Sequence, residues 1–209
     1  MKKGIFITFE GGEGVGKSTQ VKLFTEYLVK KKIPFIFTRE PGGIIQCEEI
    51  RNILLHSNCN LSIEAEALLF SASRAEHINK VILPALSEGK IVICDRFFDS
   101  SFAYQGYARG LGFDKIEKLT DVACGSLKPD LTFLLMMDPE LAFKRKGGAD
   151  QTDRIETAGL DFHKKVNEGY LLTYKKFNKR IKLINADDTI ESVNKQIINL
   201  FESYIKNKK

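Results

Sequence analysis

The chain has 209 residues, of which 43% are hydrophobic, and a formal net charge of +5 at pH 7. This length can bury one good core, so we expect a single domain over residues 1–209. The longest apolar runs fall well short of the ~20 residues that span a bilayer, and no Cys-x-x-Cys pair is present, which argues against membrane proteins, structural zinc and a disulfide framework. The modest charge does not favour nucleic acid, and a soluble cytoplasmic protein is the simplest interpretation.

Short apolar runs alternate with longer helical patterns along the whole chain. The expected strands are 4–10, 34–38, 90–94, 131–137 and 181–185. The expected helices are about 16–31, 46–55, 63–87, 115–126, 139–146, 158–178 and 189–206. This alternation predicts an α/β fold with a five-stranded parallel sheet and helices on both faces. Ligands of such sheets gather at the carboxyl ends of the strands, so the residues after each strand are the candidates for function.

A glycine-rich segment follows the first strand and precedes the first helix. It reads Gly-Gly-Glu-Gly-Val-Gly-Lys-Ser over residues 11–18, a complete Gly-x4-Gly-Lys-Ser pattern. Between a strand and a helix, such a loop wraps backbone N–H groups around the phosphates of a nucleoside triphosphate. Lys17 would reach the β- and γ-phosphates, and the Ser18 hydroxyl would hold Mg²⁺. A glycine-rich turn with an accidental lysine is the alternative. The residues expected to hold ATP are Gly11, Gly12, Glu13, Gly14, Val15, Gly16, Lys17, Ser18 and Thr19.

Polar residues also follow the second and third strands. Arg39 precedes a Glu-Pro-Gly-Gly turn, and Asp95 and Arg96 end the third strand. Asp95 is either a Mg²⁺ ligand or a helix N-cap, and the adjacent arginine favours the ligand. Two arginines beside the loop lysine indicate a second phosphate that belongs to an acceptor molecule. Transfer to an acceptor phosphate needs alignment and charge neutralisation more than a general base, because the acceptor oxygen is already ionised.

Over nearly its full length the sequence resembles the thymidylate kinase family. The resemblance rests on residues 9–20, 38–43 and 95–106, and residues 128–132 and 153–156 extend it. It implies a three-layer P-loop NTPase fold with a short lid at about 144–154. It also implies transfer of the ATP γ-phosphate to dTMP with Mg²⁺, which yields dTDP and ADP for dTTP synthesis, and a homodimer that uses the helix at 63–87.

The resemblance also implies the residues that bind dTMP. These are Glu10, Arg39, Glu40, Pro41, Phe70, Arg74, Arg96, Ser101, Tyr104 and Gln105. In the family the two arginines after the strands hold the dTMP phosphate, the phenylalanine stacks on thymine, and Arg74 hydrogen-bonds the base edge. Tyr104 crowds the sugar 2′ position. From the residues alone, Phe70 and Tyr104 also fit a core, and Arg74 also fits an ion pair with a helix carboxylate.

The chain departs from the family pattern where an arginine should face the transferring phosphoryl group. Glu13, Gly14 and Val15 occupy the relevant loop positions, so the lid must supply the charge. We expect Arg154, helped by Lys146, to neutralise it, in addition to the catalytic Lys17, Asp95 and Arg96. Arg145 is expected only to end the helix that begins at Pro139.

Two other functions fit parts of the pattern. A deoxynucleoside kinase would use Glu40 as the base that activates an acceptor hydroxyl. A nucleotide-dependent switch or ATPase would need a residue that positions water, for which the sequence offers no candidate. Arg39 and the stretch 101–106 favour a monophosphate acceptor over both.

Overall fold

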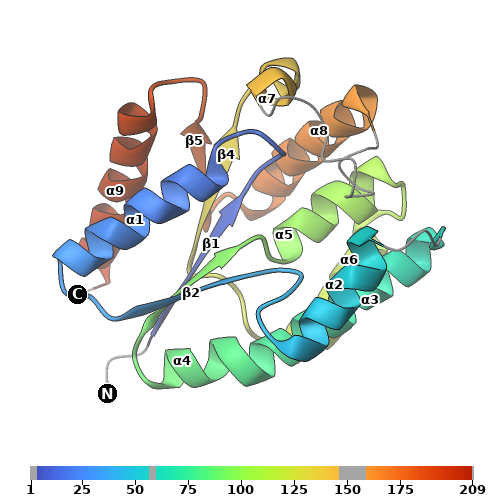
Figure 1. Cartoon of the computed structure of the whole chain (residues 1–209), viewed down its shortest axis with the longest axis horizontal. Coiled ribbons are helices and arrows are strands. Elements are labelled where there is room, and N and C mark those ends of the chain that lie inside the picture. Colours follow the sequence, from blue (N-terminus) through green and yellow to red (C-terminus); the bar gives the residue numbers. More distant parts are fainter. Residues whose placement is uncertain (1–3, 57–59, 146–158, 209) are drawn as a thin grey trace.

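A computed structural model describes residues 4–56, 60–145 and 159–208 and places a parallel sheet at the centre of the molecule (Figure 1). The strands are β1 (Ile5–Glu10), β2 (Phe35–Arg39), β3 (Ile91–Asp95), β4 (Leu131–Met136) and β5 (Ile181–Asn185). Their order across the sheet is β2-β3-β1-β4-β5, and every pair is parallel. The predicted five-stranded parallel sheet is confirmed.

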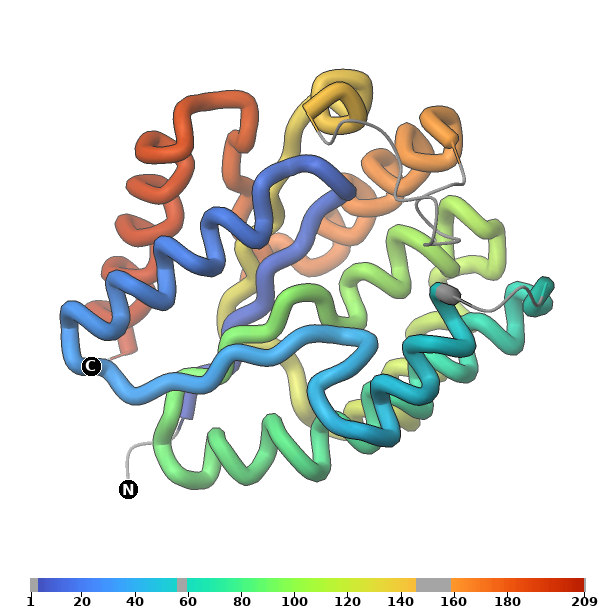
Figure 2. Tube along the Cα trace, viewed as in Figure 1, coloured from blue at the N-terminus to red at the C-terminus, as the bar shows by residue number. Residues whose placement is uncertain are grey.

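Helices cover both faces of this sheet. They are α1 (Lys17–Lys30), α2 (Ile45–His56), α3 (Ile63–His77), α4 (Leu83–Ser87), α5 (Phe98–Ser101), α6 (Phe113–Cys124), α7 (Pro139–Arg145), α8 (Leu160–Phe177) and α9 (Ile190–Asn207). Two π-helical segments, η1 (Ile78–Ile82) and η2 (Phe102–Ala108), continue α3 and α5. In Figures 1 and 2, α1 and α9 lie together on one face, and α2 to α6 lie on the other.

The alternation of side chains along the strands explains these layers. Ile7 and Phe9 of β1 pack with Phe24 of α1 and Phe201 of α9 in one core. Phe6, one residue out of phase, packs in a second core on the opposite face. Successive strand residues point to opposite faces, so a strand buried on both sides carries an unbroken apolar run.

One helical segment is absent from the sequence-based expectations. Residues 98–108 form α5 and η2, although no helix was expected between the third strand and residue 115. Phe98, Phe102 and Ala103 are all buried here, and so is Gln105. A helix surrounded by protein shows no polar face, and so its sequence lacks the alternation of apolar and polar residues from which helices are inferred. The long helix expected at 63–87 is present but contains the π-helical turn η1.

No helix in the described part of the chain combines the length and apolar character that crossing a bilayer requires.

Candidate active site

The glycine-rich loop joins β1 to α1, as the motif predicts, and three of its glycines adopt backbone angles that other residues avoid. Gly11 has φ +138°, Gly14 has φ +72° and Gly16 has φ +87°. A Cβ at Gly14 would lie 2.1 Å from the Ala142 carbonyl oxygen of α7, and one at Gly11 would lie 2.4 Å from the Leu135 carbonyl oxygen. Side chains at either position would therefore force the loop away from its neighbours.

Lys17 begins α1 and is folded back into the loop. Its Nζ donates to the carbonyl oxygens of Gly11 (3.1 Å) and Gly12 (2.7 Å). Burial, and then the positive charge of Arg96, lower the pKa of the Lys17 ammonium. The ammonium therefore already lies where the loop would bind phosphate oxygens.

A cavity opens beside the loop at the carboxyl ends of β1, β2 and β3. Lys17 and Ser18 line it on the loop side, and Arg39, Arg51 and Arg96 bring three guanidinium groups from separate elements. The other residues that line it are Glu13, Glu40, Pro41, Leu55, Phe70, Arg74, Asp95, Phe97, Ser100, Ser101, Tyr104 and Gln105. Thirteen predicted site residues and four unpredicted ones therefore share one space.

Arg96 is held in the cavity wall by contacts with several elements. Its φ of +64° is unusual for a residue with a side chain, and its backbone N–H donates to the Phe9 carbonyl oxygen at 2.9 Å. Nη1 donates to the Gly11 carbonyl oxygen (2.9 Å) and to the Tyr170 hydroxyl (2.9 Å), and Nη2 pairs with Glu13. Strained backbone of this kind persists only where its surroundings fix it, often at functional sites.

Asp95, one residue earlier, has a carboxylate oxygen that no other described residue satisfies. Oδ1 is buried and has no hydrogen-bond partner among the described residues. Asp95 and Ser18 line the same cavity. A buried carboxylate oxygen without a partner is energetically costly, and a cation bound beside it would offset this cost. Carboxylate and hydroxyl oxygens are ligands that Mg²⁺ prefers, so Asp95 and Ser18 could hold this ion.

The far end of the cavity is lined by aromatic and amide groups. Phe70 and Arg74 lie one turn apart on α3, as their spacing predicts. The guanidinium of Arg74 lies 5.3 Å from the centre of the Phe97 ring. Gln105 donates from Nε2 to Glu66 Oε1 at 2.9 Å, and the guanidinium of Arg96 lies 5.2 Å from the centre of the Tyr104 ring. A flat, partly polar ring would fit this end, because aromatic faces and fixed donors recognise heterocyclic bases.

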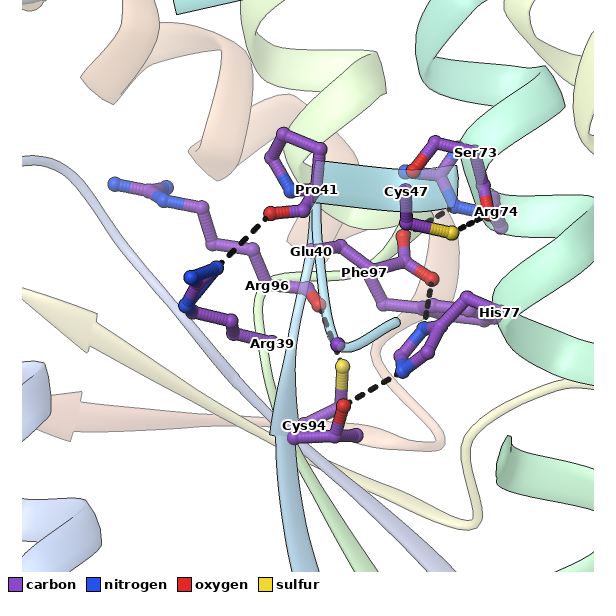
Figure 3. A network of polar contacts seen from close by, with 12 residues as sticks. Arg39, Glu40, Pro41, Cys47, Ser73, Arg74, His77, Cys94, Arg96 and Phe97 are labelled. Carbon is purple, nitrogen blue, oxygen red and sulfur yellow. Dashed lines mark hydrogen bonds and ion pairs between the residues drawn. The ribbon is translucent and has the colours of Figure 1, made fainter. Parts of the chain in front are cut away.

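Glu40 lines the cavity, and its carboxylate is held by two neighbouring side chains. Oε2 accepts from Arg74 Nε at 2.8 Å, and Oε1 lies 2.9 Å from His77 Nδ1, as Figure 3 shows. Both carboxylate oxygens are therefore engaged by protein.

Glu10 lies behind the cavity wall. It is fully buried and does not line the cavity. Its carboxylate accepts from the Phe97 N–H (2.8 Å), the Ser100 hydroxyl (2.6 Å) and the Tyr170 hydroxyl (3.1 Å). Glu10 therefore supports the segment that carries Arg96 from behind, and it does not face a substrate.

Arg51 and Leu55 of α2 are cavity residues that the sequence analysis did not name. They are four residues apart and so share a helix face. Arg51 Nη1 donates to the Pro41 carbonyl oxygen at 3.0 Å, and Arg39 Nη1 contacts the same oxygen at 3.3 Å. The position of this helix directly after the Pro-Gly-Gly turn was the available signal. Lys146 and Arg154, the expected lid cations, lie outside the described residues.

Comparison with known proteins decides the family. The family model described as thymidylate kinase matches residues 9–197. The chain belongs to the thymidylate kinase family. It is 46% identical over 200 residues to a thymidylate kinase of Clostridium novyi, covering 94% of this chain and 98% of that one. It is 43% identical over 204 residues to a thymidylate kinase of Bacillus cereus, covering 96% of this chain and 98% of that one.

A solved structure agrees with this assignment. The crystal structure of thymidylate kinase from Ehrlichia chaffeensis matches with a TM-score of 0.79 and 36% sequence identity, covering 96% of this chain and 99% of that chain. The resemblance drawn from the motifs is therefore confirmed, as is the three-layer P-loop fold.

The pH dependence of stability tests the buried position of Glu10. Burial, and then the nearby charge of Asp99, raise its pKa from 4.5 to about 8. Between these values the folded chain retains a proton that the unfolded chain releases, so the stabilisation present below pH 4.5 is lost as the pH rises to about 8. Relative to Glu10→Gln, we expect the free energy of unfolding of the wild type to fall over this range, by at most ~1.4 kcal/mol per pH unit.

Urea denaturation of both proteins at several pH values measures this difference. The Gln side chain has nearly the same shape and does not titrate, so it is the matched control. Parallel stability curves for the two proteins would show that Glu10 titrates normally in the fold.

Proposed function

We propose that this chain transfers the γ-phosphate of ATP to dTMP, forming dTDP and ADP, in the cavity between the phosphate loop and α3. The observation that carries the proposal is the joint lining of one cavity by Lys17, by three arginines and by an aromatic base site around Phe70. Family membership supports the same reaction. A triphosphate on the loop and a monophosphate on the arginines would meet at their charged ends.

The acceptor phosphate is assigned to Arg39, Arg51 and Arg96. Arg39 is also paired with Glu48, but its side chain is 42% exposed, so a phosphate can reach it. Arginine forms two parallel hydrogen bonds to phosphate and remains charged at any physiological pH. Because the acceptor oxygen is already ionised, these residues need only neutralise and align it, and no base is required.

The base and sugar are assigned to the opposite end of the cavity. Thymine would stack on Phe70 and accept hydrogen bonds from Arg74, with Ser101 and Gln105 contacting its edge. Tyr104 would occupy the space of a ribose 2′-hydroxyl and so favour deoxyribose, while Pro41 forms part of the wall. These contacts would distinguish dTMP from nucleotides whose base presents donors at the same edge.

The ATP phosphates are assigned to the backbone of residues 11–19, with Lys17 on the β- and γ-phosphates. Ser18 and Asp95 would hold Mg²⁺, a fit that the unpartnered buried Oδ1 of Asp95 supports. When bound, the ion would neutralise charge on the phosphate oxygens. Asp95, Arg96 and Lys17 would keep the two nucleotides aligned around it.

The choice of acceptor tests this function directly. With Mg·ATP, we expect ADP formation with dTMP to exceed that with dCMP, dGMP, thymidine or no acceptor by at least ~100-fold, because each alternative leaves a buried polar group of the site unpaired. A coupled assay of ADP formation measures all these acceptors, and a metal-free sample tests the need for Mg²⁺. Turnover with thymidine alone, or equal hydrolysis without an acceptor, would overturn the proposal.

The missing loop arginine leads to a prediction about the lid. Arg154→Ala should lower kcat by ~10²- to 10³-fold with little effect on binding, because it removes charge that is needed mainly in the transition state. Arg145→Ala is the matched control and should leave kcat unchanged. Arg145 contacts Asp187 and the Ala186 carbonyl oxygen instead. Full kcat in Arg154→Ala would exclude it as the catalytic cation.

We also assign a homodimer, with α3 in its interface. Leu68 on this helix is 55% exposed although it is a large apolar residue, and Ala72, one turn later, is exposed beside it. Exposed apolar patches on a folded chain commonly mark contact with another protein.

The three described cysteines, Cys47, Cys94 and Cys124, are free thiols. Free thiols are usual in a reducing compartment, so they support the expected cytoplasmic location. Cell fractionation would test this location.

A charge on this patch tests the dimer. Leu68→Glu should convert a dimer into a monomer at micromolar concentration, because burying an unpaired carboxylate in an interface is unfavourable. Val29→Glu on α1 is the control, since Val29 is similarly exposed but lies on the other face of the sheet. Light scattering of the three proteins gives the masses. A monomeric wild type would contradict the assignment.

A further inference from the structure

We propose that His77 is a positioning residue for base recognition: through Glu40 it fixes the guanidinium of Arg74 that faces the acceptor base. The proposal rests on the proposed function. His77 is fully buried at the end of α3 and does not itself line the cavity. It would act only through the two residues between it and the substrate.

Both ring nitrogens of His77 are engaged. Nδ1 lies 2.9 Å from Glu40 Oε1, and Nε2 lies 2.7 Å from the Thr38 hydroxyl. An ionised carboxylate can only accept, so Nδ1 must carry a proton. The Thr38 hydroxyl can donate as well as accept, so it can pair with Nε2 whether or not that nitrogen carries a proton. The imidazole orientation is thus determined from both sides, which is the usual way in which a histidine is held in one tautomer.

The second link joins Glu40 to Arg74. Arg74 Nε donates to Glu40 Oε2 at 2.8 Å, and the two side chains are only 2% and 3% exposed. His77 occupies the other carboxylate oxygen, so the carboxylate cannot rotate without losing one of two buried partners (Figure 3). A buried donor left without its acceptor is costly. The histidine therefore fixes the carboxylate, and the carboxylate fixes Nε of the arginine.

This arrangement leaves the terminal nitrogens of Arg74 as the donors for a ligand. The guanidinium also lies against the ring of Phe97, which restricts it from a further side. Arginine has donors only, so it recognises acceptor atoms such as the carbonyl oxygens of thymine and opposes the amino group of cytosine. Selectivity for the base then depends on how firmly the guanidinium is held.

The same cluster does not need a metal ion to explain it. The ligand atoms of Glu40, His77 and Cys94 lie within 4.8 Å of one another. However, the Cys94 thiol donates to the Arg96 carbonyl oxygen at 3.0 Å, and burial raises the pKa of this thiol. A protonated thiol and a carboxylate with both oxygens in use are poor ligands, so hydrogen bonding accounts for the group.

Two substitutions separate the contacts of the ring. The amide nitrogen of Asn lies the same number of bonds from Cβ as Nδ1 of histidine does. The amide nitrogen of Gln lies the same number of bonds from Cβ as Nε2 of histidine does. We expect His77→Asn to keep the contact with Glu40 and to change the KM for dTMP by less than ~3-fold. His77→Gln should raise that KM by ~10-fold and lower the preference for dTMP over dCMP by a similar factor, with the KM for ATP unchanged.

Ser73→Ala is the matched control. Ser73 is buried one turn earlier on the same helix, and its hydroxyl has no hydrogen-bond partner in the described part of the chain, so its loss should change neither KM. Thr38→Val removes the hydroxyl that orients the ring and should give a smaller, equally selective rise in the KM for dTMP. It replaces His77→Gln if that variant does not fold, as circular dichroism would reveal.

A merely structural role gives a different result. In that case Asn and Gln would be equally harmful, and the KM values for ATP and dTMP would rise together as thermal stability falls. That pattern, or an unchanged KM for dTMP in His77→Gln, would overturn the positioning role of His77. The proposed function would still stand as long as the wild type turns over dTMP. A wild type inactive with dTMP would instead refute the proposed function itself.

Discussion

The guanidinium of Arg96 is the contact on which the site depends, because it joins the phosphate loop to the segment after β3. It donates to the Gly11 carbonyl oxygen and pairs with Glu13, both in the loop, and it donates to Tyr170 of α8. Glu10 supports the same segment from behind through Phe97, Ser100 and Tyr170. The donor and acceptor ends of the cavity are therefore held at a fixed spacing, which is the main requirement of phosphoryl transfer.

The arginines of the cavity fall into two groups by burial. Arg39 is half-exposed, and Arg96 is partly exposed, and each is paired with a carboxylate that a phosphate could replace. Arg74 is almost fully buried, and Glu40 holds it in place. Exchangeable partners suit a group that must bind and release a highly charged phosphate. A fixed partner suits a group that must recognise one edge of a base, since preorganisation reduces the cost of ordering on binding.

The sequence predicts those features that local patterns determine. All five strands, the phosphate loop and the cluster of arginines at the strand ends follow from short apolar runs and the residues after them. The helical residues 98–108 were missed because most of them are buried, which removes the amphipathic pattern. The positions of Glu10 and Glu40 were not predictable either. Their partners are far away in sequence, with Tyr170 lying 160 residues from Glu10 and His77 lying 37 residues from Glu40.

We propose that a monophosphate acceptor lies between the arginines and Phe70, with its phosphate toward the loop. A crystal structure of the protein with ADP and dTMP measures this directly. We expect the dTMP phosphate within hydrogen-bond distance of Arg39 and Arg96, thymine stacked on Phe70, and a hydrogen bond from Arg74 to a thymine carbonyl oxygen. A dTMP phosphate away from both arginines, or thymine outside the pocket of Phe70 and Arg74, would contradict it.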